Sequence, residues 1–549
     1  MIQFNLHYLT YFFFASSFFF DSMLGSDPVP SVQRPREAGR NDKMQASKYQ
    51  TAVLDFVRKG NGHAFVSAVA GSGKTTTLKM IAEAITGKGS AAFLAFNAHI
   101  RDELATKLPQ SVTVATIHQI GLRTCAAGLG KRCQVDNQDK LSKTLIDAFI
   151  DRKFAGQSLT DEDKKEIEGL RPNLKNLIRF AKVGLIDPTD RDAIQDLIDD
   201  KDLELDVSEA MGFLRSALSE YIKRARNTGE ITFDDMIWLP NVLGFKPQQF
   251  QWVMVDESQD LNPAQRELTL KMIPANGRAI YVGDPRQAIY AFAGADAHSV
   301  QAIMDRTRAT ILPLSVCYRC PTSHIAMAQG IVPEIEAADG APVGEVLTVA
   351  EDKITGYIGL GDLVMCRTTA PLIKLAYELI GQGKPARVKG RDIGAGLVAL
   401  IDKIRRAMKI KRFEDFGAAI FDYADLQIGK LGAREGNEDK ILRVQDQTES
   451  LSAVMACVNA DSFEALKKGI EDIFTDSTPG IILATIHRVK GLEAENTVIL
   501  HPELIPHPMA KTPEAIEQEE NLRYVAFTRA KSRMILVDHP KKDKSKKGK

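Results

Sequence analysis

A glycine-rich loop between an expected strand and an expected helix constrains the fold of this chain more than any other feature. Residues 65–69 form an apolar, partly β-branched run that predicts a buried strand, and apolar residues recur at helical spacing after Thr75. Between them, Ala68 to Thr75 read AVAGSGKT. A turn of this kind directs successive backbone N–H groups and a helix N-terminus toward a phosphate group. The pattern therefore predicts an α/β fold with a phosphate-binding loop.

The residues of this loop have distinct expected roles. Lys74 is placed to reach the β and γ oxygens of a nucleotide, and the hydroxyl of Thr75 is placed to hold Mg²⁺. Ala68 stands where the strict pattern has glycine, but the two glycines nearest the lysine are those that let the backbone approach the phosphates. The residues expected to bind ATP here are Ala70, Gly71, Ser72, Gly73, Lys74, Thr75 and Thr76.

Two further strand-like segments end in polar residues. The apolar run 252–255 is followed by Asp256 and Glu257, and the run 279–283 leads into Gln287. Ligands of parallel sheets bind at the carboxyl ends of the strands. We expect Asp256 to hold Mg²⁺ through water, Glu257 to orient and deprotonate an attacking water, and Gln287 to sense the γ-phosphate.

Composition sets wider limits. A chain of 549 residues is too long for one core, so several compact units are expected. Its net charge is zero, so any nucleic-acid contact must use local basic surface. Six cysteines in so long a chain favour a reduced intracellular compartment, not secretion. Cys317 and Cys320 form a CxxC, but no second pair at metal-ligand spacing accompanies them, which disfavours zinc.

Both ends of the chain have unusual composition. The aromatic run from Tyr8 to Phe20 is too short to span a bilayer and lacks the basic segment and cleavage site of a signal peptide. We expect residues 1–43 to be an apolar extension and linker without fixed structure, and no membrane contact. Residues 540–549 are rich in lysine and predict a solvated basic tail.

A series of segments carries a family resemblance from about residue 45 to 537. In order they are Tyr49-Gln50, AVAGSGKTTTL, FLAFNAHIRDEL, TVATIHQIG, ITFDDM, VMVDESQDLNPAQ, YVGDPRQAIYAFAGA, SVCYRCP, LVMCRTTA, ATIHRVKGLEAENTVIL and NLRYVAFTRAKSRMIL. The chain resembles superfamily 1 DNA helicases of the UvrD/Rep/PcrA type. It departs from them at Pro285, Arg286 and Phe292, where relatives often carry an acid and a tryptophan, and its segment FLAFNAHIRDEL is shorter than theirs.

The resemblance implies roles for residues far from the loop. Gln50 would read the edge of the adenine, and Tyr318 would stack on its face. Glu493 would contact the ribose. Arg319 and Arg529 would reach the γ-phosphate as arginine fingers, a contribution worth about 10³ to 10⁵ in turnover.

Candidate DNA contacts fall in the loops that resemble the family's DNA-binding motifs. They are Phe96, Asn97, Thr116, His118, Tyr290, Phe292, Arg367, Thr485 and His487. Hydroxyl, amide and imidazole groups suit phosphates, and aromatic rings stack on bases for about 1–3 kcal/mol each. The alternative is that the two histidines are structural and that Tyr290 and Phe292 enter the core.

The motif positions predict two RecA-like parallel-sheet motor domains in tandem, each with a mainly helical insertion. The expected ranges are 44–120 and 231–318 for the first motor domain, 121–230 for its insertion, 319–385 and 479–539 for the second motor domain, and 386–478 for a short second insertion.

The resemblance implies an ATP-dependent DNA helicase and translocase that moves 3′ to 5′ on single-stranded DNA and acts in repair, recombination or replication. Its cofactors would be ATP and Mg²⁺. Its partners would be single-stranded and partial-duplex DNA and possible replication or recombination proteins, in the cytoplasm, nucleoid or nucleus. Two alternatives stay open: a single-strand translocase that strips bound proteins, and a P-loop ATPase switch without motor action.

Overall fold

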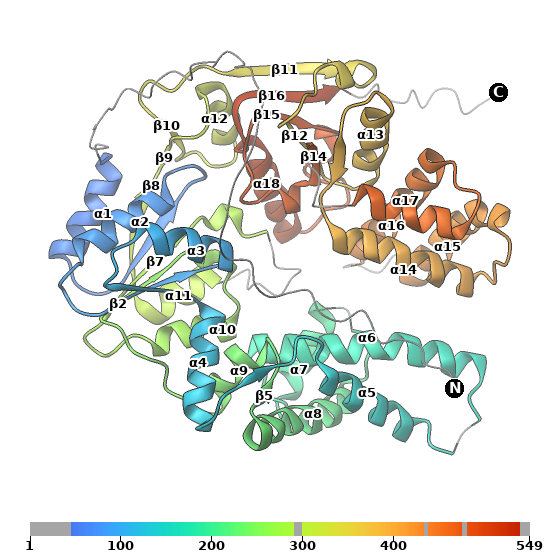
Figure 1. Cartoon of the computed structure of the whole chain (residues 1–549), viewed down its shortest axis with the longest axis horizontal. Coiled ribbons are helices and arrows are strands. Elements are labelled where there is room, and N and C mark those ends of the chain that lie inside the picture. Colours follow the sequence, from blue (N-terminus) through green and yellow to red (C-terminus); the bar gives the residue numbers. More distant parts are fainter. Residues whose placement is uncertain are drawn as a thin grey trace, which may run out of the picture. The chain divides into compact units, whose positions relative to one another are not determined.

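The computed structural model describes residues 46–156, 158–201, 203–289, 299–432, 437–474 and 480–538. Within them, two parallel sheets with helices packed on their faces follow one another along the chain (Figure 1). The expectations for residues 1–43, Tyr290, Phe292 and residues 540–549 fall outside the described residues. The fold class expected from the sequence is confirmed: the chain holds two parallel-sheet α/β domains in tandem.

The first sheet has the strand order β3-β2-β6-β7-β1-β8, and every neighbouring pair is parallel. Its strands are β1 (Ala64–Ala68), β2 (Ala91–Ala95), β3 (Val112–Thr116), β6 (Trp252–Val255), β7 (Arg278–Gly283) and β8 (Thr310–Leu314). Alternate residues feed two cores, so Phe65 lies in one hydrophobic cluster and Val66 in the other. Burial on both faces explains why these strands read as continuous apolar runs.

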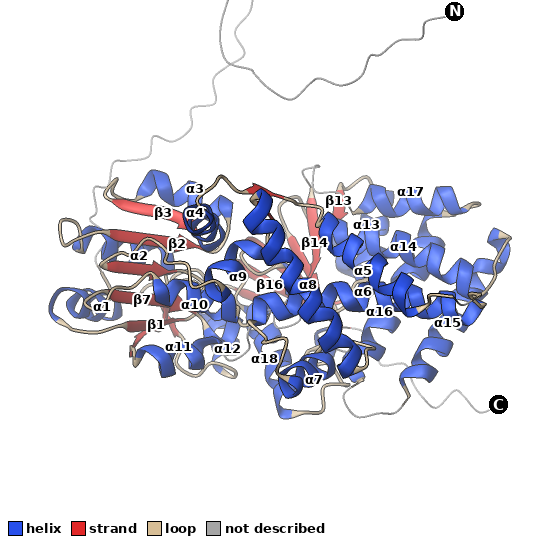
Figure 2. Ribbon diagram, turned by 90° about the horizontal axis from the view of Figure 1, so that it is seen from below, coloured by secondary structure: helices blue, strands red, loops and turns tan. Residues whose placement is uncertain are grey.

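Helices cover both faces of this sheet (Figure 2). They are α1 (Lys48–Lys59), α2 (Lys74–Ala84), α3 (Ala98–Lys107), α4 (Ile117–Leu129), α9 (Asp235–Val242), α10 (Pro263–Lys271) and α11 (Ser299–Thr307), with the short 3₁₀ turns η1 (Ser258–Asp260) and η2 (Pro285–Gln287). Ser47, Asn97 and Thr116 each accept a backbone N–H at a helix start. Such caps fix where α1, α3 and α4 begin.

A helical segment lies between α4 and α9, within the range expected for the first insertion. It comprises α5 (Lys140–Lys153), α6 (Asp161–Gly184), α7 (Arg191–Asp200) and α8 (Val207–Thr228). The short parallel strands β4 (Gln134–Val135) and β5 (Glu230–Ile231) pair at its two ends. Its apolar side chains continue the hydrophobic cluster beneath the first sheet, so the segment is anchored to that domain.

The second sheet has the order β11-β16-β15-β12-β14-β13 and is also parallel throughout. Its strands are β11 (Glu345–Ala350), β12 (Leu363–Cys366), β13 (Ala386–Val388), β14 (Ile481–Thr485), β15 (Ala494–Ile499) and β16 (Ala530–Asp538). Accompanying elements are α12 (Thr322–Gln329), α13 (Ala370–Gly381), α18 (Pro513–Phe527), the strand pair β9 (Val316–Cys317) and β10 (Glu336–Ala337), and the 3₁₀ turns η4 (Glu351–Gly356), η6 (Ile486–Arg488) and η7 (Pro502–Leu504). Because β13 pairs with β14, the sheet extends past residue 385, where the sequence set its boundary.

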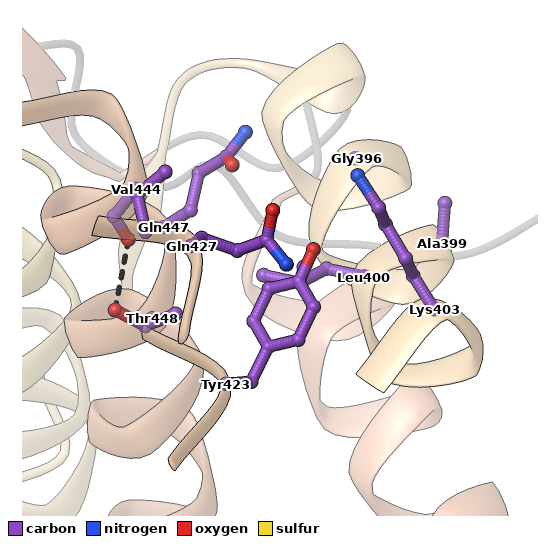
Figure 3. A pocket seen from close by; sticks show the side chains of 9 residues that line it. All are labelled: Gly396, Ala399, Leu400, Lys403, Tyr423, Gln427, Val444, Gln447 and Thr448. Carbon is purple, nitrogen blue, oxygen red and sulfur yellow. Dashed lines mark hydrogen bonds between the residues drawn. The ribbon is translucent and has the colours of Figure 1, made fainter. Parts of the chain in front are cut away.

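A second helical segment follows β13. It consists of the 3₁₀ turn η5 (Phe413–Asp415) and the helices α14 (Arg391–Ala407), α15 (Phe416–Leu431), α16 (Glu438–Val458) and α17 (Phe463–Ile473). Its core includes an aromatic cluster in which Phe463 meets Phe413 and Phe416 edge to face. A cavity of about 240 Å³ lies between α14, α15 and α16, with Tyr423 and Gln427 beside it (Figure 3). None of its lining residues was a site candidate from the sequence.

Across the described part of the chain, no helix combines the length and apolarity that crossing a lipid bilayer requires.

A buried ion pair joins the first helical segment to the first sheet domain. Lys182 of α6 lies 2.8 Å from Asp235 of α9, and both side chains are 1% exposed. The Lys182 ammonium also sits 3.0 Å from the centroid of the Tyr221 ring. Removing one partner of such a pair leaves an uncompensated buried charge.

We therefore expect Lys182→Met to lower the free energy of unfolding by about 3–5 kcal/mol. Lys153→Met is the matched control, because Lys153 pairs at the surface of the same segment with Glu166 and Glu209 and is 27% exposed. Loss of that surface pair should cost about 0–1 kcal/mol. Urea unfolding followed by circular dichroism measures both, and equal losses in the two variants would contradict the assigned role of the buried pair.

Candidate functional site

The phosphate-binding loop joins β1 to α2, as the sequence predicted. Gly71 and Gly73 have φ angles of +67° and +78°, a region that favours glycine. Gly73 caps α2 without a side-chain hydrogen bond, so the first N–H groups of this helix have no side-chain cap. Ser72 is 2% exposed, and its hydroxyl oxygen has no hydrogen-bond partner among the described residues. Thr75 is exposed in the first turn of α2, followed by the half-buried Thr76.

Lys74 and Glu257 form the central charge pair of the site. The Lys74 Nζ lies 3.0 Å and 3.1 Å from the two carboxylate oxygens of Glu257. Glu257 follows β6 with a φ of +48°, which turns its side chain back toward the loop. Gln259 donates from Nε2 to one of these two oxygens at 2.6 Å. The carboxylate is therefore held by two donor side chains.

Acidic groups crowd around this pair, and burial controls their pKa values. Burial and the neighbouring charge of Glu257 raise the pKa of Asp256, although Lys74 opposes the shift. Burial would also raise the pKa of Glu257, but the charges of Lys74 and Lys490 lower it below its usual range. Burial likewise raises the pKa of Asp260 to about 6, against the effect of Lys490. The site therefore holds one carboxylate with a lowered pKa beside others whose pKa values are raised.

The end of β7 is tied to the end of β6. The Asp284 backbone N–H donates to Gln259 Oε1 at 3.1 Å, and Gln287 donates from Nε2 to Asp284 Oδ2 at 2.7 Å. A Cβ added at Gly283 would stand 2.4 Å from Gln259 Oε1, so only glycine fits this approach. The strand order puts β7 between β1 and β6, which is why the loop, the acids and Gln287 share one edge of the sheet.

The two predicted arginine fingers lie beside each other but hold different partners. Arg319 contacts Glu493 at 2.6 Å and donates to the backbone oxygen of Thr528 at 3.2 Å. Arg529 is 1% exposed and donates to the backbone oxygens of Val525 at 2.9 Å and Leu492 at 3.3 Å. Burial, followed by the charge of Arg319, lowers the pKa of Arg529 to about 10. Its charge is held by neutral oxygens, and no ion pair of Arg529 occurs among the described residues.

Glu493, expected at the ribose, also contacts Lys531 at 2.7 Å. It immediately precedes β15, and Arg529 immediately precedes β16. These two strands pair with each other in register at Ala494 and Ala530. The sheet therefore places Glu493 and Arg529 at one edge.

The segment that leads from β8 into the second sheet domain meets the loop directly. The Tyr318 N–H donates to the backbone oxygen of Gly71 at 2.9 Å. A Cβ added at Gly71 would stand 2.8 Å from the Cβ of Arg319 and 2.9 Å from the sulfur of Cys317. One from Gly73 would be 3.9 Å from the Tyr318 ring and 3.6 Å from the Gln50 amide. Gln50 itself is 4% exposed and donates to the Thr77 hydroxyl at 3.1 Å.

Sequence reasoning missed two residues of the second sheet domain that contact the first. Tyr524 of α18 accepts a hydrogen bond from the Ala70 N–H at 2.7 Å and donates to Asp284 at 3.2 Å. Lys490, after η6, lies 2.5 Å from Asp260 and donates to the Gln287 backbone oxygen at 2.7 Å. Both lie inside motifs that the sequence displayed. Their roles depend on contacts across more than two hundred residues, so only the tertiary structure could reveal them.

Candidate DNA contacts of the first sheet lie at the ends of its neighbouring strands β2 and β3. Phe96 is 41% exposed after β2, and Asn97 caps α3 through its side-chain oxygen. Thr116 ends β3 and caps α4, which begins with Ile117 and His118. Burial lowers the pKa of His118 to about 4, so its ring is neutral near pH 7.

Phe233 is a further exposed aromatic that the sequence analysis did not single out. It is 52% exposed, and its ring stacks on His118 with centroids 3.9 Å apart. Phe233 lies in the segment ITFDDM, directly before two acids. That position inside a family-like motif is the sequence feature that could have marked it as a site candidate. Exposed stacked rings of this kind suit a base-stacking platform.

Candidate DNA contacts of the second sheet lie at the ends of the paired strands β12 and β14. Arg367 follows β12 and is engaged by Glu519 of α18 at 2.7 Å. Thr485 ends β14 and is 9% exposed, so little of its side chain is open to a ligand. Burial, together with Arg367 and Arg488, lowers the pKa of His487 to about 3, which makes its ring neutral. The proposed DNA roles of Tyr290 and Phe292 lie outside the described residues.

Comparison with known families identifies the chain. The model of the UvrD/REP helicase N-terminal domain matches residues 49–307, and that of the UvrD-like helicase C-terminal domain matches residues 403–541. The chain belongs to the UvrD-like superfamily 1 helicases. The two matched ranges include the phosphate-binding loop in one case and Arg529 in the other.

Individual relatives of this UvrD-like chain are distant. It is 23% identical over 504 residues to F-box DNA helicase 1 of Gallus gallus, a match that covers 86% of this chain and 47% of the relative. It is 22% identical over 501 residues to F-box DNA helicase protein 1 of Schizosaccharomyces pombe, covering 86% and 55%. ATP-dependent DNA helicase UvrD1 of Mycobacterium tuberculosis is 26% identical over 296 residues, covering 49% and 37%. The chain thus spans about half the length, or less, of these relatives.

The contact at Gly71 can be tested against a matched glycine. Gly62 has a similar φ of +73° but nothing lies within 4 Å of an added Cβ. Gly62→Ala should therefore cost only the left-handed strain of about 1–2 kcal/mol. Gly71→Ala should cost about 1–3 kcal/mol more, because its methyl group would meet Arg319 and Cys317. Urea unfolding of the two variants measures the difference, and equal losses would argue against a close contact at Gly71.

Proposed function

We propose that this UvrD-like chain is an ATP-dependent DNA translocase and helicase. The observation that carries the proposal is the contact between the phosphate-binding loop and the segment of Tyr318 and Arg319. The Tyr318 N–H reaches the backbone oxygen of Gly71 at 2.9 Å, and Arg319 lies against the same glycine. Nucleotide-binding groups from both halves of the chain thus adjoin one another, as a motor that opens and closes on ATP requires.

The loop fits a nucleotide and a divalent cation. The positive φ angles of Gly71 and Gly73 give the loop a turn that can cradle phosphates, and the Ser72 hydroxyl lacks a partner among the described residues. Thr75 and Asp256 would hold Mg²⁺, and the raised pKa of Asp256 fits an acid that awaits a positive charge. Mg²⁺ supplies neutralisation of phosphate charge when bound. These residues carry the assignment of ATP and Mg²⁺.

Lys74 and Glu257 suggest how binding prepares hydrolysis. In this structure Lys74 donates to both oxygens of Glu257. The same ammonium is placed to bind phosphate oxygens, and an incoming phosphate therefore competes with Glu257 for it. After release from Lys74, the charge of Lys490 still lowers the pKa of Glu257, and Gln259 still holds its carboxylate at 2.6 Å. An ionised carboxylate held in one orientation can accept a proton from an attacking water.

Tyr524 and Lys490 offer a route from the ATP site to the DNA surface. Tyr524 connects the loop residue Ala70 to α18, and α18 also carries Glu519, which holds Arg367. Arg367 and Thr485 are candidate DNA contacts at the ends of β12 and β14. Movement of α18 relative to the loop would thus alter the surroundings of a DNA-facing arginine. This linkage supports a motor over a switch without motor action.

The finer parts of the proposal concern direction, substrate and pathway. We propose 3′ to 5′ movement on single-stranded DNA, unwinding of partial duplexes, and an intracellular role in repair, recombination or replication. The names of the relatives support only the DNA-helicase part of this proposal, and the polarity rests on the family resemblance. A translocase that strips bound proteins is the alternative that the short second helical segment, residues 391–473, favours.

ATPase and unwinding assays on matched substrates test the function. A motor should hydrolyse ATP faster with single-stranded DNA and should unwind a duplex with a 3′ tail but not one with a 5′ tail. ATPase activity indifferent to DNA would support the switch. Displacement of streptavidin from a biotinylated strand without duplex unwinding would support the stripping translocase.

Lys74→Ala and Glu257→Gln separate binding from hydrolysis. Lys74→Ala should abolish turnover because the phosphates lose their cation. Glu257→Gln should keep nucleotide affinity but lose hydrolysis by about 10²-fold or more, because the amide cannot accept the proton. Lys79→Ala is the control, since Lys79 is exposed on the same helix. ATPase rates and binding of a fluorescent ATP analogue report both steps, and substantial turnover in either variant would refute the site assignment.

Arg529→Ala should reduce turnover by about 10³-fold or more while DNA affinity stays close to that of the parent chain. Arg523→Ala is the matched control, because Arg523 is on the neighbouring turn of α18 and pairs with Glu520 at 3.2 Å. Steady-state ATPase and fluorescence anisotropy with labelled single-stranded DNA measure the two properties. A selective loss of DNA affinity would argue against the finger role.

Phe233→Ala should weaken binding of single-stranded DNA by about 1–3 kcal/mol if its ring stacks on a base. Basal ATPase activity without DNA should change little. The control is Phe421→Ala, which removes an aromatic side chain that is 62% exposed on α15. Anisotropy titrations with an oligonucleotide compare the two variants, and identical affinities would exclude Phe233 from the DNA-binding surface.

A further inference from the structure

Two cysteines bracket the residues that join the second half of the chain to the phosphate-binding loop. Cys317 ends β9 and Cys320 lies two residues before α12, with Tyr318 and Arg319 between them. Both thiols are free and buried, at 0% and 3% exposure. Neither takes part in the proposed hydrolysis. No cluster of three or more potential metal ligands occurs among the described residues, so the pair is not accompanied by the further ligands of a zinc site.

The neighbours of Cys317 favour its thiolate form. They are the Cys320 thiol and the backbone N–H groups of Arg319 and Cys320. Donors of this kind stabilise a thiolate, and the pKa of Cys317 is lowered accordingly, with further help from the Arg319 charge. The pKa of Cys320 is raised by its hydrogen bond to Cys317 and by burial. The two residues are thus arranged as an attacking thiolate and a resolving thiol.

This pair lies against the phosphate-binding loop. A Cβ added at Gly71 would stand 2.9 Å from the Cys317 sulfur. Cys317 and Cys320 share one hydrophobic cluster with Val69, Ala70 and Tyr524. A change in the covalent geometry of the two cysteines would therefore alter the packing of the loop and of Tyr524, which accepts a hydrogen bond from the loop.

We propose that Cys317 and Cys320 are a reversible disulfide modification site that stops ATP turnover when a low-molecular-weight disulfide such as oxidised glutathione oxidises it. The predicted loss of ATP turnover depends on the proposed function being correct. Formation of the disulfide itself does not depend on it. Because Gly71 covers Cys317, the oxidant gains access when the contact between the loop and this segment opens.

The chemistry balances with that oxidant alone. The Cys317 thiolate attacks one sulfur of the small disulfide, forms a mixed disulfide and releases one thiolate. The Cys320 thiol then attacks the Cys317 sulfur, and its proton goes to the thiolate already released. The second small thiolate leaves and takes a proton from water. In total, two cysteine thiols lose two electrons and the small disulfide becomes two thiols.

Disulfide formation must displace Tyr318 or Arg319. In a disulfide the two sulfurs, which are not bonded to each other in this structure, would lie at a covalent length of about 2.05 Å, with a dihedral angle of about 90°. Only Tyr318 and Arg319 lie between the cysteines to absorb this change. Tyr318 donates to Gly71, and Arg319 packs on the same residue and pairs with Glu493. The adenine-stacking and γ-phosphate groups proposed for the second half would both lose their positions.

The test exposes the full chain to buffers with increasing ratios of oxidised to reduced glutathione. Non-reducing peptide mass spectrometry should find a peptide linked through Cys317 and Cys320. DNA-stimulated ATPase should fall at least tenfold in parallel and return when dithiothreitol is added. A linked peptide with unchanged ATPase would overturn the switch, and so would the absence of the linked peptide while other cysteines become modified.

Cysteine variants assign the effect. Cys317→Ser should keep ATPase activity in oxidising buffer, because it lacks the attacking thiolate, and Cys317→Ala serves the same purpose if a buried serine impairs folding. Cys320→Ser should instead accumulate a mixed disulfide at Cys317, because it lacks the resolving thiol, and peptide mass spectrometry should detect that adduct. Cys457→Ser is the control, since this half-buried cysteine lies in the second helical segment and should leave the response unchanged. An equal loss of activity in Cys317→Ser and the parent chain would overturn the proposal.

Failure of the proposed function would be visible separately. If the reduced parent chain shows no DNA-stimulated ATPase, the motor proposal fails, and binding of a fluorescent ATP analogue then reports the switch. A linked peptide together with at least tenfold weaker nucleotide binding would support the modification site in that case. A linked peptide with unchanged nucleotide binding would overturn it.

Discussion

The close approach of Gly71 to Tyr318 and Arg319 is the contact on which the arrangement of the candidate site depends. It brings the loop of the first sheet domain against a segment that leads into the second. A side chain at Gly71 would collide with Arg319 and Cys317, so the approach requires glycine and a left-handed backbone. Tyr524 reinforces it from α18 through the Ala70 N–H. Groups separated by hundreds of residues share a site because this contact forms.

Charge balance within that site follows from burial. Asp256, Glu257, Asp260 and Asp284 lie together, and Lys74 and Lys490 bring positive charge close to them. Burial favours the protonated form of most of these acids, while the two lysines keep Glu257 ionised. The lysine from the loop and the lysine from the second half therefore both set the ionisation of the proposed general base. This arrangement makes the chemistry sensitive to how the halves meet.

Local patterns allowed much of the architecture to be predicted. The run before Ala68, the glycine turn and the helical spacing after Lys74 predicted β1, the loop and α2, because burial and backbone geometry leave few alternatives for these residues. The two parallel sheets were predicted from the positions of the motifs, and the continuous apolar runs of their strands agree with burial on both faces. The extension of the second sheet to β13 was missed because its strand is short and half-buried. Neither periodicity nor composition distinguishes such a strand from a loop.

The sequence by itself determined the family, the fold class and the identity of the residues beside the phosphate-binding loop, because these depend on local order and on motif spacing. Only the tertiary structure decided that Tyr524 bonds Ala70, that Lys490 meets Asp260, and that Phe233 stacks on His118. It also placed the Cys317 and Cys320 pair against Gly71. Such contacts join residues far apart along the chain, and a hydrogen bond or ring stack depends on distance and direction in space, which sequence spacing does not encode.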